Sequence, residues 1–204
     1  MAITGASGAP YAVRLLEQLV AARRPVSLIV SAHGWRLLET ESGIADIDAL
    51  RARTGGAAWK GLVTLFDDGD RGAAPASGSV KNDGMVVCPC SMGTLAAIAA
   101  GTSRSLVERA ADVALKERRR LVLVTRETPL SAIHLENMLR VTNAGAVVMP
   151  AAPGFYHRPA AVSDLVDFIV ARVLDHLEVE HSVGRRWSGE APAEAPPAPR
   201  RGKR

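Results

Sequence analysis

The chain has 204 residues, which is enough for one well-cored domain and short for two. Apolar residues make up 48% of it and charged residues 23%, a composition that indicates a globular protein and excludes the disordered and fibrous classes. The net charge of +4 is modest, and several positive charges lie in the last few residues, so the composition argues against a nucleic-acid-binding protein.

The sequence predicts neither a membrane span nor a secretion signal. No stretch approaches the roughly 18 uninterrupted apolar residues that a transmembrane helix needs, and the N-terminus lacks the pattern of a signal peptide. The two cysteines, Cys88 and Cys90, are separated by one residue, which is too close for an ordinary disulfide. This cysteine usage predicts a protein of the reducing cytoplasm.

The first forty residues predict a strand, a helix, a strand and a helix. The strand at residues 1–4 leads into the loop Gly5-Ala6-Ser7-Gly8, and a helix with Pro10 in its first turn follows. A buried strand at 26–30 and a helix at 32–41 complete the unit. This order favours a parallel sheet with right-handed crossovers.

The pattern weakens between residues 42 and 84, where residues 62–66 alone are typical of a strand. Residues 69–83 predict a loop that is long for a compact domain, a length that often marks a functional segment. A strand at 84–88 then leads through a turn into a helix of small residues at 94–100.

Beyond residue 104 helices and strands alternate again. In chain order we expect a helix at 105–118, a strand at 121–125, a helix at 131–142, a strand at 146–149 and a helix at 162–177. Residues 1–187 are therefore predicted to form one α/β domain. Residues 188–204 lack periodicity and are rich in Ala, Pro, Glu and Arg, which predicts a disordered tail.

Ligands of open α/β sheets bind at the carboxyl ends of the strands. The predicted ends here are mostly hydroxyl-bearing or small residues beside helix starts, where backbone N–H groups and the helix dipole favour phosphate. They are Gly5-Ala6-Ser7, Ser31, Cys90-Ser91-Met92-Gly93-Thr94, Arg126-Glu127 and the loop through Tyr156. The first loop is neither a Walker loop nor a dinucleotide fingerprint, so packing of a tight turn is an equal alternative to phosphate binding.

Arg126 and Glu127 leave a predicted strand together and are followed by Pro129. They allow two interpretations: a local ion pair before a Pro-led helix, or an anion clamp beside a carboxylate that transfers protons. The charges at Arg109, Asp112 and Lys116 share one predicted helix face, where solvated pairing is the default explanation.

The cysteines do not predict a metal site, because one intervening residue is poor spacing for zinc and no second pair exists. We expect Cys88 to pack in the core and Cys90 to line a loop.

Five segments carry motifs that are specific only when taken together. They are residues 3–9 (ITGASGA), 88–95 (CPCSMGTL), 108–118 (ERAADVALKER), 126–131 (RETPLS) with 134–139 (HLENML), and 153–157 (PGFYH). The set resembles the UbiX-type flavin prenyltransferases, over residues 1 to about 187 and weakly between 45 and 75.

The resemblance implies a flavodoxin-like Rossmann fold, a three-layer sandwich with a parallel sheet, assembled as trimers packed into dodecamers. It implies a metal-free reaction in which reduced FMN takes a prenyl group from dimethylallyl phosphate. The product would serve as the cofactor of a UbiD-type decarboxylase.

The resemblance also implies roles for individual residues. The FMN-binding residues would be Gly5, Ala6, Ser7, Ser31, Ser91, Met92, Gly93, Thr94 and Arg126. The donor phosphate would be held by Tyr156 and Arg172, with charge added by Arg109 and Lys116 across a subunit interface, and Trp187 would close the prenyl pocket. Glu127 would transfer protons in catalysis, assisted by Ser7, Glu41 and Lys116.

Two other functions stay open from the residues. An FMN-dependent decarboxylase of the related cysteine-decarboxylase group would use a base for which His33 is the candidate, but Arg126-Glu127 and Tyr156 with Arg172 have no purpose there. A non-catalytic flavin-binding subunit would keep the FMN positions and leave the other charged positions free to vary.

Overall fold

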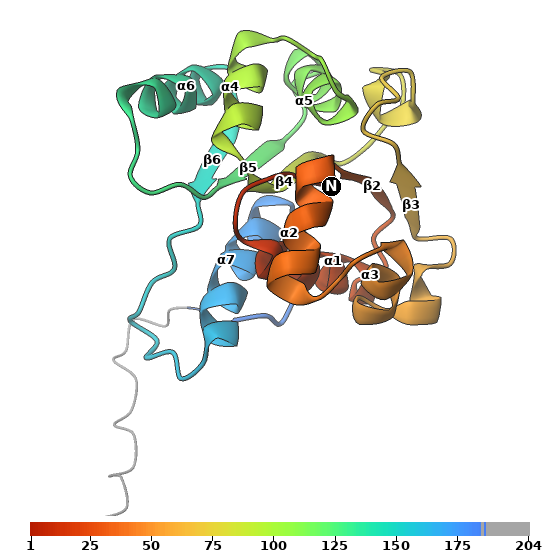
Figure 1. The fold of residues 1–204 in the computed structure, drawn as a ribbon, viewed down its shortest axis with the longest axis vertical. Helices are drawn as coiled ribbons and strands as arrows, with labels where there is room; N and C mark the ends of the chain where they lie inside the picture. The colour runs from red at the N-terminus through yellow and green to blue at the C-terminus, as the bar shows by residue number, and fades with distance from the viewer. Residues whose placement is uncertain (185, 187–204) are drawn as a thin grey trace, which may run out of the picture.

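The computed structural model describes residues 1–184 and 186; Trp187 and the predicted tail 188–204 lie outside the described residues (Figure 1). Six strands form one parallel sheet in the order β3-β2-β1-β4-β5-β6. The strands are β1 Ala2–Ile3, β2 Val26–Val30, β3 Val63–Phe66, β4 Met85–Cys90, β5 Leu121–Thr125 and β6 Val147–Pro150. The predicted α/β fold with a parallel sheet is confirmed.

The strand order is that of a doubly wound Rossmann sheet, and without the edge strand β3 it becomes the flavodoxin-like order. Strand β1 pairs with both β2 and β4, with Ala2 opposite Ile29 on one side and Val87 on the other. The winding therefore reverses between β1 and β4. The carboxyl ends of these two strands form the topological switch point, where such folds bind ligands.

Helices cover both faces of the sheet and make three layers (Figure 1). The helices are α1 Ala9–Ala21, α2 Ala32–Ser42, α3 Ile47–Arg53, α4 Met92–Ala100, α5 Leu106–Lys116, α6 Ala132–Asn143 and α7 Val162–His176. One layer contains α1, α3 and α7, with α2 packed against α1, and the other contains α4, α5 and α6.

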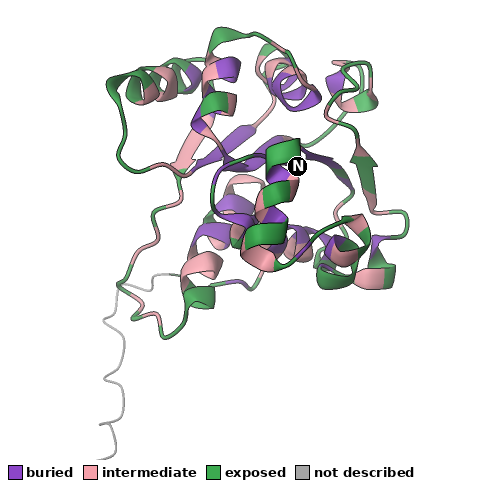
Figure 2. Ribbon diagram, viewed as in Figure 1, coloured by how far each residue is buried: buried purple, intermediate pink, exposed green. Residues whose placement is uncertain are grey.

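The central strands are buried because helices cover them on both sides (Figure 2). Along β5, Val122 and Val124 pack toward α1 and α7, whereas Leu121 and Leu123 pack toward α4 and α5. This alternation is the two-residue period of a strand.

Cys90 corrects one sequence prediction, because it ends β4 and is fully buried rather than lining a loop. The register of β4 shifts between Val87 and Cys90, so Cys88 joins the core on one face and Cys90 the core on the other. Burial raises the pKa of Cys88 far above its usual value and that of Cys90 to about 12. Both thiols are therefore inert packing groups at neutral pH.

The region of weak pattern holds a helix that the sequence analysis missed. Helix α3 is capped by Asp46, whose carboxylate accepts a hydrogen bond from the Ala49 amide at 2.8 Å. Leu50 alone among its residues is buried, so the helix shows almost no apolar periodicity. The loop predicted at 69–83 is present and contains one 3-10 turn at Ala74–Ala76.

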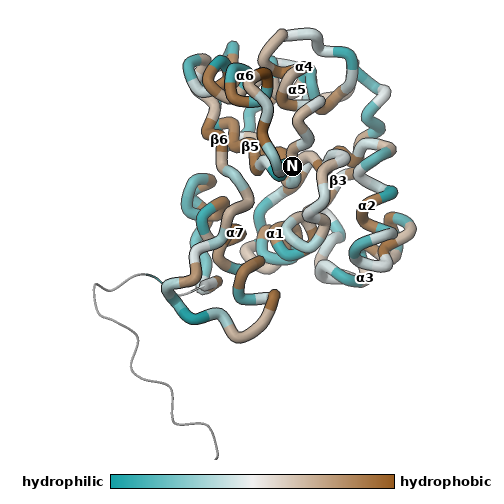
Figure 3. Tube along the Cα trace, turned by 60° about the vertical axis from the view of Figure 1, so that its left-hand side comes forward, coloured by the Kyte–Doolittle hydropathy of each residue, from teal (hydrophilic) through white to brown (hydrophobic). Residues whose placement is uncertain are grey.

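Helix α6 contains apolar residues, brown in Figure 3, of which several are exposed. Ile133 and Leu139 are 68% and 62% exposed, and Leu135 is exposed beside them.

Over the described ranges, no helix combines the length and apolar composition needed to cross a bilayer.

Candidate active site

Thr4 joins the two loops at the switch point. Its hydroxyl donates to the Pro89 carbonyl at 2.9 Å and accepts from the Ser91 amide at 2.9 Å, and its side chain is buried. The loop after β1 and the start of α4 are thereby held together. Sequence reasoning missed this role because the partners lie 85 and 87 residues away and no local signal marks them.

Two serines at strand ends cap the helices that follow. The Ser31 hydroxyl accepts from the Gly34 amide at 3.1 Å, and the Ser91 hydroxyl accepts from the Thr94 amide at 3.2 Å. By helix geometry the amides of Met92 and Gly93 lack an intrahelical acceptor, so they point out of the start of α4. Such a helix start favours an anion.

Two glycines at the carboxyl ends of the strands, Gly5 and Gly93, differ in the space around them. A Cβ on Gly5 would lie 2.6 Å from the Cβ of His33, so the first loop and α2 approach too closely for any side chain. A Cβ on Gly93 would meet nothing nearer than the Ser91 hydroxyl at 3.9 Å. Glycine costs helix stability relative to alanine, and the chain itself does not require it at position 93. The position thus leaves room for a ligand close to the backbone.

Glu41 reaches from the end of α2 to the start of α1. Its carboxylate accepts from the amides of Gly8 and Ala9 at 2.8 Å each. Burial raises the pKa of Glu41, but the Gly8 amide, the Ser7 hydroxyl, the Ala9 amide and the charge of Arg126 outweigh it, and the net pKa is lowered. Glu41 is therefore an ionised acceptor at neutral pH, and a phosphate would have to displace it to bind these two amides.

Arg126 turns toward the first loop, where its Nε donates to the Ser7 carbonyl at 3.1 Å. Glu127 lies half-buried beside it and accepts from the Thr128 amide at 3.2 Å. Among the described residues no ion pair joins Arg126 to Glu127, so the local-pair interpretation fails. Hydrogen bonds thus connect the loop after β1 and the start of α1 to the start of α4, to Glu41 of α2 and to Arg126 beyond β5.

Tyr156 and Arg172 lie elsewhere in the chain, in a cavity of about 590 Å³ between the loop after β6 and helix α7. The Tyr156 ring packs on His157 with centroids 4.2 Å apart and edge-on against Phe168 at 5.8 Å. The lining of this cavity includes no residue of the loops that follow β1, β2, β4 and β5.

Arg109 and Lys116 lie on α5. Arg109 forms an ion pair with Asp112 at 2.6 Å, as the helical spacing predicts, whereas Lys116 pairs with Glu117 instead. Lys116 ends α5 shortly before β5 begins, so it lies at the amino-terminal edge of the sheet, opposite Arg126 and Glu127. Within one chain, Lys116 and Glu127 do not meet.

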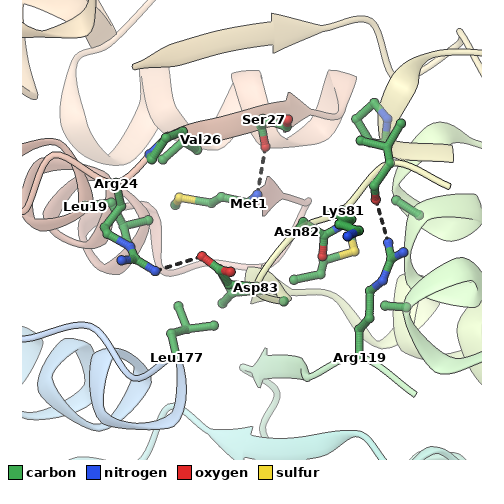
Figure 4. A pocket seen from close by; sticks show the side chains of 18 of the residues that line it. Met1, Leu19, Arg24, Val26, Ser27, Lys81, Asn82, Asp83, Arg119 and Leu177 are labelled. Atoms are coloured by element: carbon green, nitrogen blue, oxygen red, sulfur yellow. Dashed lines mark hydrogen bonds and ion pairs between the residues drawn. The ribbon is translucent and has the colours of Figure 1, made fainter. Parts of the chain in front are cut away.

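Another cavity, of about 620 Å³, opens at the same amino-terminal edge (Figure 4). Arg24 pairs there with Asp83 at 2.8 Å, and Arg119 donates to the Val80 carbonyl at 2.8 Å. None of the candidate site residues that the structure describes lines it. In the part of the chain that the structure describes, no three His, Cys, Asp or Glu residues are grouped to hold a metal ion.

The fold and these loops define a doubly wound α/β protein of the kind that binds nucleotides at its switch point. A family model described as Flavoprotein matches residues 1–174, so the chain belongs to the flavoprotein family.

The chain is 51% identical over 193 residues to the flavin prenyltransferase UbiX of Pseudomonas aeruginosa, covering 92% of each chain. It resembles the structure of AnUbiX (PadA1) in complex with FMN and dimethylallyl pyrophosphate, with 42% identity and a TM-score of 0.83 over 93% of this chain and 96% of that one. A dodecameric FMN-dependent UbiX-like decarboxylase from Escherichia coli O157:H7 has 43% identity and a TM-score of 0.84 over 92% and 97%. The chain belongs to the UbiX family of flavin prenyltransferases.

The cysteine-decarboxylase alternative is less well supported. The FMN-dependent cysteine decarboxylase TvaF shares 16% identity with a TM-score of 0.59, a likeness in fold alone. The resemblance found in the sequence motifs is thus confirmed at the level of family and fold.

Proposed function

We propose that this chain joins the dimethylallyl group of dimethylallyl phosphate to reduced FMN, and that the strand ends at the switch point hold the flavin. The observation that carries the proposal is the convergence of Ser7, Ser31, Ser91 and Arg126 from four separate strand ends. AnUbiX, which is similar over nearly the whole chain, is a complex with FMN and dimethylallyl pyrophosphate.

The residues at these strand ends fit FMN. The start of α4, with the amides of Met92 and Gly93 and the hydroxyl of Thr94, offers donors for a phosphate, and Gly93 leaves the backbone accessible. Arg126 adds a positive charge beside Ser7, in the loop that also carries Gly5 and Ala6. When bound, reduced FMN supplies the nucleophilic ring atoms that accept the prenyl group.

Hydrogen-bond donors and positive charges of the chain assist the departure of phosphate. Breaking the allylic carbon–oxygen bond leaves negative charge on phosphate, which Tyr156 and Arg172 stabilise through hydrogen bonds. Arg109 and Lys116 add positive charge from a neighbouring subunit, because α5 carries Lys116 to the edge opposite Glu127 in its own chain. Trp187 is proposed to cover the prenyl group, whose cationic character an aromatic face stabilises.

Bond formation on the flavin releases protons, and Glu127 is the carboxylate that receives them. Glu41 cannot donate a proton at neutral pH while its pKa is lowered, so we assign it to orient Ser7 and the start of α1. Ser7 then presents its hydroxyl to the flavin edge.

We propose that the chain works as a homo-oligomer, with a dodecamer as the expected form. The exposed apolar residues Ile133, Leu135 and Leu139 on α6 supply a surface that a second copy would bury. The similar E. coli protein is described as dodecameric. Subunit contact would bring Lys116 to Glu127 and exclude water from the allylic cation.

The product would pass to a UbiD-type decarboxylase, and we place this exchange in the cytoplasm. Two unbridged cysteines are consistent with a reducing compartment. Residues 1–187 would form the catalytic domain, and 188–204 a tail without a catalytic role.

Purified protein supplied with reduced FMN and dimethylallyl phosphate under anaerobic conditions is expected to yield a flavin heavier by one five-carbon prenyl unit. Mass spectrometry of the extracted flavin measures this, with dimethylallyl diphosphate as a parallel donor. Recovery of unmodified FMN alone, from protein whose flavin occupancy has been verified, would contradict the proposal.

Replacing Gly5 with Ala is expected to weaken FMN binding about tenfold or more, because the new methyl group displaces either the first loop or α2. Fluorescence quenching of FMN on titration measures the affinity. The double change Gly5→Ala with His33→Gly removes the Cβ that the methyl group meets and should recover part of the affinity. A Gly5→Ala protein with unchanged FMN affinity would show that this contact is not needed.

A further inference from the structure

One carboxylate near the end of α7 binds three side chains with cationic or N–H donor groups. Asp175 accepts from Arg172 Nη1 at 3.0 Å through one oxygen. Through its other oxygen it accepts from Arg186 Nη2 at 2.9 Å and contacts His181 Nε2 at 3.2 Å. All four residues line the cavity that contains Tyr156. The family motifs and the proposed function leave Asp175, His181 and Arg186 without a role.

The hydrogen bonds of His181 determine which ring nitrogen carries its proton. The Val183 amide donates to Nδ1 at 3.2 Å, so Nδ1 is an acceptor and Nε2–H donates to Asp175. The side chain of His181 is only 4% exposed. A neutral imidazole therefore satisfies both contacts and holds the backbone at residues 181–183 against α7.

Asp175 stays ionised within this group. Burial opposes its ionisation, but the hydrogen bonds from His181 and Arg186 outweigh burial and hold the pKa of the carboxyl below its usual value. Its side chain keeps 24% exposure, whereas Arg186 is largely exposed at 75%. The carboxylate is thus the common anchor, and the arginines extend from it toward solvent.

The contact with Asp175 uses one N–H of Arg172 and leaves the other donors of its guanidinium available for a second anion. A guanidinium held on one side loses less conformational freedom when it binds phosphate on another. The same carboxylate keeps His181 and Arg186 beside Arg172, at the wall of the cavity.

We propose that Asp175 is a positioning residue for the prenyl donor: it holds Arg172 in the orientation that binds the donor phosphate and keeps His181 and Arg186 next to it. The inference rests on the proposed function, which assigns Arg172 to that phosphate.

A competing role for Asp175 would change the affinity for the donor in the opposite direction. If Asp175 merely competed with phosphate for Arg172, removing its negative charge would tighten binding of the anionic donor. If it positions Arg172, removing the charge loosens the arginine and weakens binding. One substitution, Asp175→Asn, separates the two.

We expect Asp175→Asn to raise the KM for dimethylallyl phosphate about tenfold, with a smaller change in kcat and unchanged FMN affinity. The Kd of dimethylallyl phosphate for the FMN-loaded protein, measured by calorimetry, should rise in parallel. Hydrogen–deuterium exchange should speed up at the Val183 amide, because its acceptor His181 loses its anchor. An unchanged or lower KM and Kd would overturn the proposal.

Two further variants separate positioning from a general loss of stability. Asp167→Asn is the matched control: it makes the same change on the same helix and in the same cavity lining, but its carboxylate binds Arg14 of α1. It should lower Tm and leave the KM unchanged. In an Arg172→Ala background, Asp175→Asn should add no further rise in KM or Kd, because the residue acts through Arg172. An additive effect would overturn the proposal.

The experiment also distinguishes failure of the inference from failure of the proposed function. Wild-type protein that makes no prenylated flavin would refute the function. Wild-type protein that is active, with an equally active Asp175→Asn variant, would refute the inference alone. The donor Kd and the exchange rate at Val183 do not depend on turnover and test Asp175 in either case.

Discussion

Replacing Glu127 with Gln should slow prenylation of FMN by about 10²–10⁴-fold, the usual contribution of a positioned general base, while FMN remains bound. The amide has the shape of the carboxylate but cannot accept a proton. Glu127 follows Arg126 at the end of β5 and makes only a local contact to the Thr128 amide, so its loss should not disturb the fold. Single-turnover measurement of flavin mass against time gives the rate, and flavin absorbance of the purified protein gives the occupancy.

The control for this prediction is Glu39→Gln, an equal change on the exposed side of α2. It should behave as the wild type in both measurements. Full activity of Glu127→Gln would remove Glu127 from the proton transfer, and loss of bound FMN would reassign it to flavin binding.

Lys116→Ala and Glu127→Gln proteins, each strongly impaired alone, should regain activity when they are mixed, unfolded and reassembled. Lys116 and Glu127 lie at opposite edges of the sheet in one chain, so a complete site needs both residues from different subunits. In a random equal mixture, about one quarter of the sites combine an intact Lys116 with an intact Glu127. Native mass spectrometry verifies mixed oligomers, and the yield of prenylated flavin measures the recovery.

A second mixture supplies the control. Arg126→Ala and Glu127→Gln lie side by side at the end of β5, so every site takes both positions from one chain. Mixing these two variants should restore nothing. Absence of recovery in the first mixture, with mixed oligomers present, would place Lys116 outside the catalytic site or within its own chain's site.

Sequence patterning predicts much of the architecture of this chain because most of its elements are buried on a regular face. Every position of β4 and β5 is buried, as expected for parallel strands covered on both sides, and β2 is apolar except at the exposed Ser27. Helix α3 was not predicted because Leu50 is its one buried residue, and helix propensity without an apolar period is a weak signal. Cys90 was assigned to a loop because a local pattern cannot show the register shift that keeps it in β4.

The sequence by itself determined the local features of the candidate site: strand ends where hydroxyl-bearing and small residues lie beside helix starts, among them Ser31 and Ser91, which cap helices in the structure. Each depends on residues within a single turn of the chain. The family motifs added the chemistry expected of Arg126 and Glu127.

Only the tertiary structure decided which of these groups meet. Glu41 binds the start of α1 from 33 residues away, Thr4 joins Ser91 across 87 residues, and Arg126 reaches Ser7 across 119 residues. The strand order brings these segments together, and side-chain periodicity carries no information about strand order. Arg172 is one helical turn from Asp175, but His181 and Arg186 become neighbours of Asp175 only where the chain beyond α7 folds back.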